Sequence, residues 1–346
     1  MLILAIETSC DDTSCAVLEV TGGARSPKFA VRSSVVSSQI KVHAPYGGVV
    51  PTLAAREHVK NLPIVFQKTM KKAHVKMKDI DFIAVTQGPG LAIALLVGIQ
   101  FARGLAYAYG KKIIPVNHIA GHIFSNWLLD THVKFPLLNI VVSGGHTELI
   151  LMKRIGDYKI LGATRDDAAG EAFDKVAKML GLAYPGGPVI SELAKEGNSE
   201  AYALPRPMIG SKDSDFSFSG LKTAVLYLLK KEPDIAKNKK KLADLCASFE
   251  QAVADVIIAK TLKAARLSKA KTVALSGGVS ANTRLRKQLQ ETFKRELPHV
   301  TVLIPEKNLT TDNAVMIAIS AFFNKKTARS WKKLDANANL TIEETS

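Results

Sequence analysis

Residues 1–20 read MLILAIETSCDDTSCAVLEV, and the order of apolar and polar segments in this stretch indicates how the fold begins. An apolar run at residues 1–8 is followed by a polar turn at residues 9–14 and a second apolar run at residues 15–20. Two short apolar runs on either side of a polar turn predict a β-hairpin at the start of the chain.

Further strands and helices alternate along the rest of the chain. Short apolar runs that end at paired glycines recur at residues 138–145 (LNIVVSGG) and 272–278 (TVALSGG). Strands that alternate with helices predict an α/β fold, and the shared Ser-Gly-Gly is a possible trace of duplication. Apolar residues at helical spacing predict helices over residues 51–70, 91–109, 171–180, 242–267 and 313–323.

The length predicts two lobes, because 346 residues exceed the roughly 250–300 at which one hydrophobic core stops growing. A polar stretch before Pro136 places the boundary near Lys134. The first lobe is then residues 1–133, and the second is residues 134–325 with an insertion near residues 200–245. Residues 326–346 are expected to form a basic peripheral tail.

Composition narrows the class of protein. The longest apolar run, residues 91–99, is far shorter than the roughly 20 residues of a membrane-spanning helix, and no export or transit signal is visible. The three cysteines lack C-x-x-C spacing, which argues against a disulfide framework and a thiolate zinc site. We therefore expect a cytoplasmic protein with no membrane partner.

The chain is strongly basic. It has 47 Lys and Arg residues against 31 Asp and Glu residues, a net charge of +16, with clusters at residues 68–78, 230–241 and 325–333. Each cluster alone is typical of a solvated helix face. The excess over the whole chain favours a polyanionic partner, although charge does not distinguish RNA, DNA and an anionic membrane.

Two histidines four residues apart, His118 and His122, would share one face of a helix and could bind one metal ion. Local hydrogen bonds could equally satisfy both rings. A zinc protease of the HExxH type needs Glu directly after the first His, where this chain has Ile119, so that class is disfavoured. Asp312 precedes an apolar helix, so it could cap that helix, supply a third ligand, or do both.

Three loops that follow predicted strands carry hydroxyl groups, at residues 8–13, 143–147 and 276–282. In the last two, paired glycines let backbone N–H groups turn toward a phosphate. Three such loops in one chain favour nucleotide binding. The Gly-Pro-Gly at residues 88–90 could be a fourth, or simply a packing turn.

Taken together, these segments resemble the TsaD family, and they follow one another in family order from the first residues to Ala314. The resemblance rests on IETSCDDT at 6–13, YGGVVP at 46–51, GPG at 88–90, NHIAGH at 117–122, VSGGHTEL at 142–149, DDAAGEAFDKVAKMLGLAYPGGP at 166–188, PRPM at 205–208, DFSFSGLKTAV at 215–225, SGGVSAN at 276–282 and TDNA at 311–314.

The resemblance implies a two-lobed α/β fold of the actin, sugar-kinase and Hsp70 (ASKHA) type, with a nucleotide cleft between the lobes. It also implies a transferase that moves the threonylcarbamoyl group from threonylcarbamoyl-AMP to N6 of adenosine 37, releasing AMP. The acceptors would be tRNAs that read codons beginning with A, and the product is the modified base t6A. The basic composition suits a tRNA substrate, and the glycine loops suit an adenylate.

Residue roles follow from the same resemblance. The metal ligands would be His118, His122 and Asp312, with Fe²⁺ expected and Zn²⁺ possible. Asp11, Asp12 and His146 are candidates for the group that removes a proton. The expected nucleotide-binding residues are the phosphate loop Val141, Val142, Ser143, Gly144 and Gly145, the ribose or adenosine contacts Asp174 and Gly187, the adenine contact Asn282, and Ser191, which stands where many members have an acidic group.

The resemblance implies protein partners as well. Bacterial relatives work with the paralogue TsaB as a heterodimer and with the ATPase TsaE, and we expect residues 51–61 to form the TsaB-binding face. Mitochondrial relatives act alone as homodimers, so both arrangements stay open. A nucleotide-binding scaffold without catalysis and a peptidase are the alternative functions, although no activated nucleophile lies beside the histidine pair in the sequence.

Overall fold

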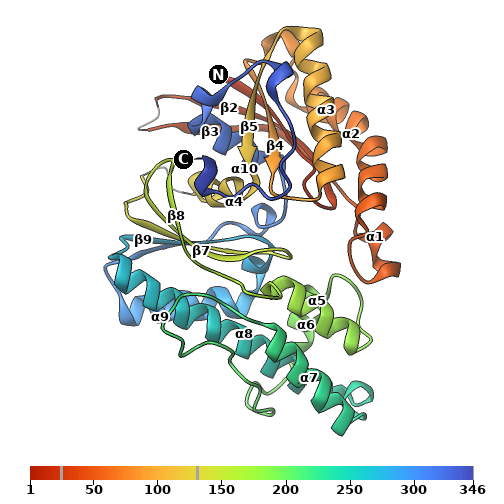
Figure 1. Cartoon of the computed structure of the whole chain (residues 1–346), viewed down its shortest axis with the longest axis vertical. Coiled ribbons are helices and arrows are strands. Elements are labelled where there is room, and N and C mark those ends of the chain that lie inside the picture. Colours follow the sequence, from red (N-terminus) through yellow and green to blue (C-terminus); the bar gives the residue numbers. More distant parts are fainter. Residues whose placement is uncertain (24–25, 130–131, 346) are drawn as a thin grey trace. The chain divides into compact units, whose positions relative to one another are not determined.

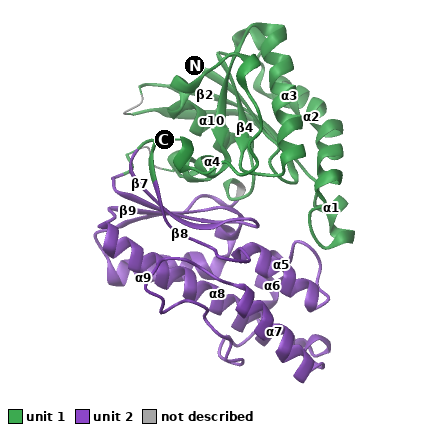
Figure 2. Cartoon of the chain, viewed as in Figure 1, with its two compact units in different colours: residues 1–133, 155–158, 308–346 green, residues 134–154, 159–307 purple. Residues whose placement is uncertain are grey.

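The computed structural model describes residues 1–23, 26–129 and 132–345, and Figure 2 shows that the chain forms two compact units. The first unit comprises residues 1–133, 155–158 and 308–346, and the second comprises residues 134–154 and 159–307. The change of unit after residue 133 coincides with the predicted lobe boundary. The assignment of the C-terminal residues differs from the prediction.

The first unit contains a five-stranded sheet with the order β3-β2-β1-β4-β5 (Figure 1). β1 and β2 are antiparallel, with Ile6 opposite Cys15, which confirms the predicted hairpin. β1, β4 and β5 are parallel. The strands are β1 (Leu2–Glu7), β2 (Asp12–Thr21), β3 (Lys28–Ser38), β4 (Phe82–Gly88) and β5 (Lys112–Asn117).

Helices cover both faces of this sheet, which explains why β1 is apolar at nearly every position. Leu4 and Ile6 of β1 share a core with α2 (Pro51–Ala73) and α3 (Ala92–Tyr109). Residues of α10 (Ala314–Phe323) contact β1, β2 and the short helix α4 (His118–Phe124). The short helix α1 (Ile40–His43) precedes α2.

The prediction that residues 308–325 belong to the second lobe, and that residues 326–346 form a peripheral tail, is wrong. α10 is apolar on every side and buried along nearly its whole length, so it needs a surrounding core, which the first unit supplies. Beyond it, Arg329 pairs with Ile113 of β5, and the side chains of Leu334 and Ile342 are buried.

Among the described residues, α3 alone is long and apolar enough to cross a membrane, judged only by length and composition. No such segment was expected from the sequence, because Gln100 and Arg103 interrupt the apolar run of this helix. One helix of this kind is weak evidence for a membrane span. Its inner side, including Leu95 and Ile99, is buried against the sheet and α2, while Leu96 and Tyr107 on its outer side are exposed.

The second unit contains a sheet with the order β10-β9-β6-β7-β8, in which β6 and β9 are parallel neighbours. Its strands are β6 (Leu137–Val142), β7 (Thr147–Arg154), β8 (Asp157–Ala163), β9 (Thr272–Ser276) and β10 (Thr301–Leu303). Its helices are α5 (Ala169–Met179), α6 (Gly186–Ala194), α7 (Ser219–Lys231), α8 (Lys239–Ser268) and α9 (Thr283–Glu296).

The region predicted as an insertion, residues 200–245, is part of the core of the second unit. Leu221 and Val225 of α7, together with Ile235, are fully buried in the same hydrophobic cluster as α8. Residues 239–245 form the first two turns of α8. Leu204, Phe216, Phe218 and Leu245 belong to the same cluster, so apolar residues along the whole region anchor it in the second unit.

Candidate metal centre and nucleotide-binding loops

His118, His122 and Asp312 meet in the first unit as a compact group. One ligand atom from each lies within 4.8 Å of the others. Nε2 of His122 is 3.2 Å from Oδ1 of Asp312, and Nε2 of His118 is 3.5 Å from the same oxygen. Both histidine side chains are buried, and the carboxylate is partly exposed. The structure thus brings together the three residues that the sequence analysis proposed as metal ligands.

Helix caps and one glycine create this arrangement. The side chain of Asn117 accepts hydrogen bonds from the backbone N–H groups of Ile119 and Ala120, so α4 begins at His118 and presents both imidazoles. A Cβ atom on Gly121 would lie 2.9 Å from the side chain of Ile317, so glycine permits the close packing of α4 on α10.

Asp312 is not the N-cap of α10. That role belongs to Asn313, whose Oδ1 accepts a hydrogen bond from the backbone N–H of Met316 at 3.0 Å. The cap prediction was therefore displaced by one residue. Because Asn313 caps the helix, the carboxylate of Asp312 lies beside the two imidazoles.

The chemistry of the group fits a divalent cation. Both ring nitrogens of His122 are buried and make no hydrogen bond among the described residues, since the contact of Nε2 with Asp312 is close but is not a hydrogen bond; this is costly unless a ligand is bound. Burial lowers the pKa of His118, but the charges of Asp312 and Glu7 outweigh that effect and raise it to about 9. The site therefore has a negative potential. Two imidazoles and one carboxylate suit Zn²⁺ or Fe²⁺ and leave coordination positions for substrate.

Glu7 is a functional residue that the sequence analysis missed. Its fully buried carboxylate accepts hydrogen bonds from the backbone N–H of Ser9 at 2.5 Å and the hydroxyl of Thr86 at 2.7 Å. The other contact is Nδ1 of His118, at 3.2 Å. A carboxylate on Nδ1 orients the ring and directs Nε2 toward the ligand group, as in many histidine metal sites. The signal in the sequence was an acidic residue at the end of an otherwise apolar strand.

Asp11 and Asp12, two of the candidates for proton removal, lie half-buried at the end of the β1–β2 turn. Burial, together with the charge of Asp312, raises the pKa of both carboxyl groups, and that of Asp12 reaches about 7. Oδ1 of Asp12 has no hydrogen-bond partner within the described residues. A carboxylate with a pKa near neutrality is suited to general base catalysis.

The two Ser-Gly-Gly loops lie side by side in the second unit, because β6 and β9 are parallel neighbours and end at the same edge of the sheet. Gly277 has φ +87°, and a Cβ atom there would lie 2.4 Å from the carbonyl oxygen of Val142. A Cβ atom on Gly170, in the first turn of α5, would lie 2.6 Å from the carbonyl oxygen of Ser143. Val141 and Val142 are buried, whereas Gly144 and Gly145 are exposed at the tip of the loop. His146 follows the loop and is half-buried.

Asp174 and Gly187 lie close to each other through the turn that precedes α6. Oδ1 of Asp174 accepts a hydrogen bond from the backbone N–H of Gly186 at 2.7 Å, so this carboxylate holds the turn. A Cβ atom on Gly186 would clash with Ala177, whereas one on Gly187 would meet only Cβ of Phe173, at 4.0 Å. Gly187 is thus not required by packing.

Asn282 has a structural role in addition to its predicted adenine contact. Its Oδ1 accepts from the backbone N–H of Leu285 at 2.8 Å and so caps α9. Its Nδ2 donates to Oγ of Ser191 at 2.9 Å and to the buried carboxylate of Glu250 at 2.5 Å. The structure brings Asn282 and Ser191 together, but it commits the side-chain amide of Asn282 to the protein itself.

Comparison with known proteins shows what the whole chain is similar to. The family model "TsaD: tRNA N6-adenosine threonylcarbamoyltransferase" matches residues 30–319. The chain belongs to this family.

Curated members are similar over nearly the whole chain. The tRNA N6-adenosine threonylcarbamoyltransferase of Thermosipho africanus is 48% identical over 343 residues, covering 99% of this chain and 100% of the relative. That of Thermodesulfovibrio yellowstonii is 50% identical over 326 residues, covering 93% and 94%. The family and the transferase class predicted from the sequence are confirmed.

Solved structures confirm the fold class. The HypF of T. kodakarensis, a protein with an ASKHA-like fold, aligns with a TM-score of 0.60 at 14% identity. The alignment covers 94% of this chain and 47% of that chain, so the likeness concerns only part of HypF and its fold alone. The TsaD family assignment, by contrast, rests on full-length sequence similarity.

Proposed function

We propose that this chain transfers the threonylcarbamoyl group of threonylcarbamoyl-AMP to N6 of adenosine 37 in tRNAs that read codons beginning with A. In this reaction the N6–carbon bond forms, the bond from the carbamoyl carbon to the phosphate oxygen breaks, AMP leaves, and N6 loses a proton. The observation that carries the proposal is the His118, His122 and Asp312 group, in a chain that belongs to the transferase family.

These three residues would hold one divalent ion, Fe²⁺ or Zn²⁺, which would supply Lewis-acid polarisation of donor oxygens. Glu7 keeps the ring of His118 in the orientation that points Nε2 at the group. The N–H groups of Gly144 and Gly145 are suited to hold the phosphate of the adenylate, whereas the N–H of Ser143 donates to the carbonyl oxygen of His146 at 2.8 Å. Asp174, Gly187, Ser191 and Asn282 would surround the nucleoside.

The attacking N6 amine is a weak nucleophile, so orientation and proton removal should provide most of the protein's contribution. Asp12 is the favoured acceptor for that proton, because its pKa is near neutrality and one carboxylate oxygen lacks a partner among the described residues. Asp11 and His146 are the other candidates.

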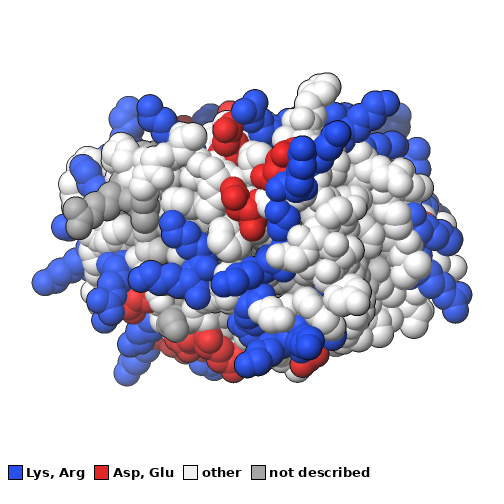
Figure 3. Space-filling view, turned by 90° about the horizontal axis from the view of Figure 1, so that it is seen from above, with Lys and Arg blue, Asp and Glu red and all other residues white. Residues whose placement is uncertain are grey.

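The surface charge supports tRNA as the acceptor. Lys and Arg side chains are spread over the face shown in Figure 3, whereas acidic side chains form only a few small groups there. A net charge of +16 attracts a phosphate backbone and predicts binding that weakens steeply with salt. We place the protein in the cytoplasm.

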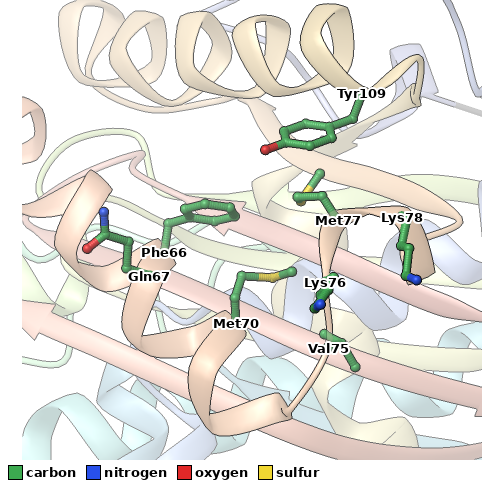
Figure 4. A pocket seen from close by; sticks show the side chains of 8 residues that line it. All are labelled: Phe66, Gln67, Met70, Val75, Lys76, Met77, Lys78 and Tyr109. Carbon is green, nitrogen blue, oxygen red and sulfur yellow. The ribbon is translucent and has the colours of Figure 1, made fainter.

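The family resemblance supports TsaB and TsaE as partners. Val59, on the predicted partner face of α2, is 61% exposed. Phe66 lies two turns further along the same helix face and lines an apolar pocket with Met70, Met77 and Tyr109 (Figure 4). A charge on this face, as in Val59→Glu, should abolish co-purification with TsaB; an unchanged complex would place the interface elsewhere.

The deciding experiment is transfer of labelled threonine from threonylcarbamoyl-AMP to tRNA, with and without TsaB and TsaE. The matched variant is the His118→Ala, His122→Ala pair. Loss of Lewis-acid stabilisation worth several kcal/mol should reduce transfer by about 100-fold or more.

Label on tRNA with the wild type, but not with the variant, supports both the reaction and the metal site. Tight binding of tRNA and nucleotide without label under any combination would favour a scaffold that binds but does not catalyse. Full activity of the variant would contradict the metal site but not the transfer reaction.

A further inference from the structure

Three fully buried polar side chains, Gln39, His43 and His58, lie in the first unit and take no part in the metal group. Gln39 precedes α1, His43 ends α1, and His58 lies in the middle of α2. A buried polar group is costly unless its hydrogen bonds are made, so a cluster of three calls for an explanation.

The hydrogen bonds of this cluster form one directed chain. The backbone N–H of Val50 points at Nδ1 of His43, 3.3 Å away, so this nitrogen is an acceptor and the ring proton is on Nε2. Nε2 of His43 then donates to Oε1 of Gln39 at 3.1 Å. Nε2 of Gln39 donates to Nδ1 of His58 at 3.3 Å, and Nε2 of His58 donates to the carbonyl oxygen of Cys10 at 2.9 Å.

The bond from Gln39 to Ala54 fixes this direction, and the contact of Thr13, whose hydroxyl can donate or accept, is compatible with it. The hydroxyl of Thr13 lies 2.8 Å from Nδ1 of His58, and Nε2 of Gln39 also donates to the carbonyl oxygen of Ala54 at 3.3 Å. In both histidines Nε2 therefore carries the donating N–H, and Nδ1 is the acceptor. A proton on Nδ1 of His58 would face the N–H of Gln39 and break the chain.

The chain ends at the turn that carries the two acidic candidates. Cys10 precedes Asp11, and the carbonyl oxygen of Asp11 accepts a second bond, from the backbone N–H of Gln39 at 3.0 Å. The cluster therefore donates hydrogen bonds to the carbonyl oxygens of Cys10 and Asp11, the two residues that precede Asp12. At its other end it holds Val50, the residue directly before α2.

We propose that His58 is a positioning residue: through its Nε2–H bond to Cys10, it holds the Asp11–Asp12 turn in its reactive geometry and links that turn to α1 and α2. This inference rests on the proposed roles of Asp11 and Asp12. It predicts that His58 affects the rate of transfer rather than the binding of metal or tRNA, because it touches neither the metal group nor the basic surface.

The test compares His58→Phe with His58→Gln in the complete transfer assay. Phenylalanine fills the space without a donor, whereas the glutamine amide can donate to Cys10 and accept from Thr13 and Gln39. Thr69→Val is the matched control, because Thr69 is also buried on α2 but donates to Cys15 and Val65, away from the turn.

We expect His58→Phe to lower kcat by about 10-fold to 100-fold, in the range found when a supporting hydrogen bond of a site is removed, with KM for tRNA and metal content unchanged. His58→Gln should recover most of kcat, and Thr69→Val should retain it despite a similar loss of stability. Nitrogen NMR of the wild type should show both rings as the Nε2–H tautomer.

Equal kcat for His58→Phe and Thr69→Val would overturn the inference, as would an Nδ1–H tautomer at His58. If His58→Phe does not fold, the glutamine variant and the tautomer still decide the matter. An inactive wild type would instead refute the proposed function, so the two failures are distinguishable.

Discussion

Neighbouring aspartates in the two units differ in the direction of their pKa shifts: the pKa values are raised in the first unit and lowered in the second. In the first unit, burial and the neighbouring Asp312 raise the pKa of Asp11 and Asp12. In the second unit, the exposed Asp166 and the buried Asp167 have lowered pKa values, because hydroxyl and N–H groups bind Asp166 and two lysines bind Asp167. No ion pair of Asp11 or Asp12 is found among the described residues, and a bound cation would supply the counter-charge, whereas Asp167 has its counter-charge in Lys175 and Lys222.

The ring of His122 in the first unit and the side-chain amide of Asn282 in the second unit differ in the same way, in whether the protein itself binds their polar atoms. His122 has no hydrogen-bond partner for either ring nitrogen among the described residues, while the amide of Asn282 uses all its polar atoms on Ser191, Glu250 and Leu285. We infer that the first unit contributes side chains to chemistry. The second unit would recognise its nucleotide mainly through backbone groups at glycine positions.

Replacing Asp12 with Asn should produce the largest effect and would sharpen the comparison. Removal of the general base is expected to lower kcat by about 100-fold or more, measured by threonine transfer under single-turnover conditions. Asp11→Asn serves as the matched control. A greater loss in the control would move the role of base to Asp11.

The same substitution should stabilise the metal-free protein. The pKa of Asp12 is about 7 in the folded chain against 3.8 ordinarily, so wild-type stability falls as pH rises from about 4 through 7. The Asn side chain of the variant does not titrate, so the free energy of unfolding of Asp12→Asn should increasingly exceed that of the wild type over that window. At pH 8 the difference should exceed about 1 kcal/mol, which corresponds to less than one pKa unit. Denaturant unfolding at pH 5 and pH 8 measures this, and equal differences at both pH values would contradict the raised pKa.

Glu7→Gln tests whether the buried carboxylate orients the metal group. Loss of a carboxylate behind a histidine ligand typically lowers metal affinity by about 10-fold to 100-fold. Chelator competition on the purified protein measures this without any activity assay. Thr86→Val removes only one hydrogen-bond donor to Glu7, so it should lower metal affinity less than Glu7→Gln does. Unchanged affinity in Glu7→Gln would restrict this residue to holding the backbone of Ser9.

Much of the site was predictable because its signals are local. Histidines four residues apart predict a shared helix face, and paired glycines after a strand predict a loop at the sheet edge; the structure contains both. The predicted helices over residues 51–70, 91–109 and 242–267 correspond to α2, α3 and α8, since their apolar periodicity spans several turns.

The remaining features depend on contacts between distant segments. Glu7 and His118 are 111 residues apart, so their pairing leaves no spacing pattern. The grouping of α10 with the first unit depends on which sheet face is uncovered, and a uniformly apolar helix does not encode its partner. α6 and α9 were missed, because one is short and begins with glycines and the other has few apolar residues.

Gly187→Ala should have the smallest effect on the fold and gives the cleanest test of the second unit. A Cβ atom there meets nothing closer than Phe173 at 4.0 Å, so the stability change should stay within about 0.5 kcal/mol. If the nucleoside packs on this glycine, the added methyl should still weaken binding of an adenylate analogue by about 10-fold, the equivalent of 1.4 kcal/mol. Calorimetric titration measures that affinity. Gly186→Ala is the control for stability: its Cβ atom clashes with Ala177, so this variant should unfold more easily than the wild type. Unaltered affinity for the adenylate analogue in Gly187→Ala would exclude this face of α6 from nucleotide recognition.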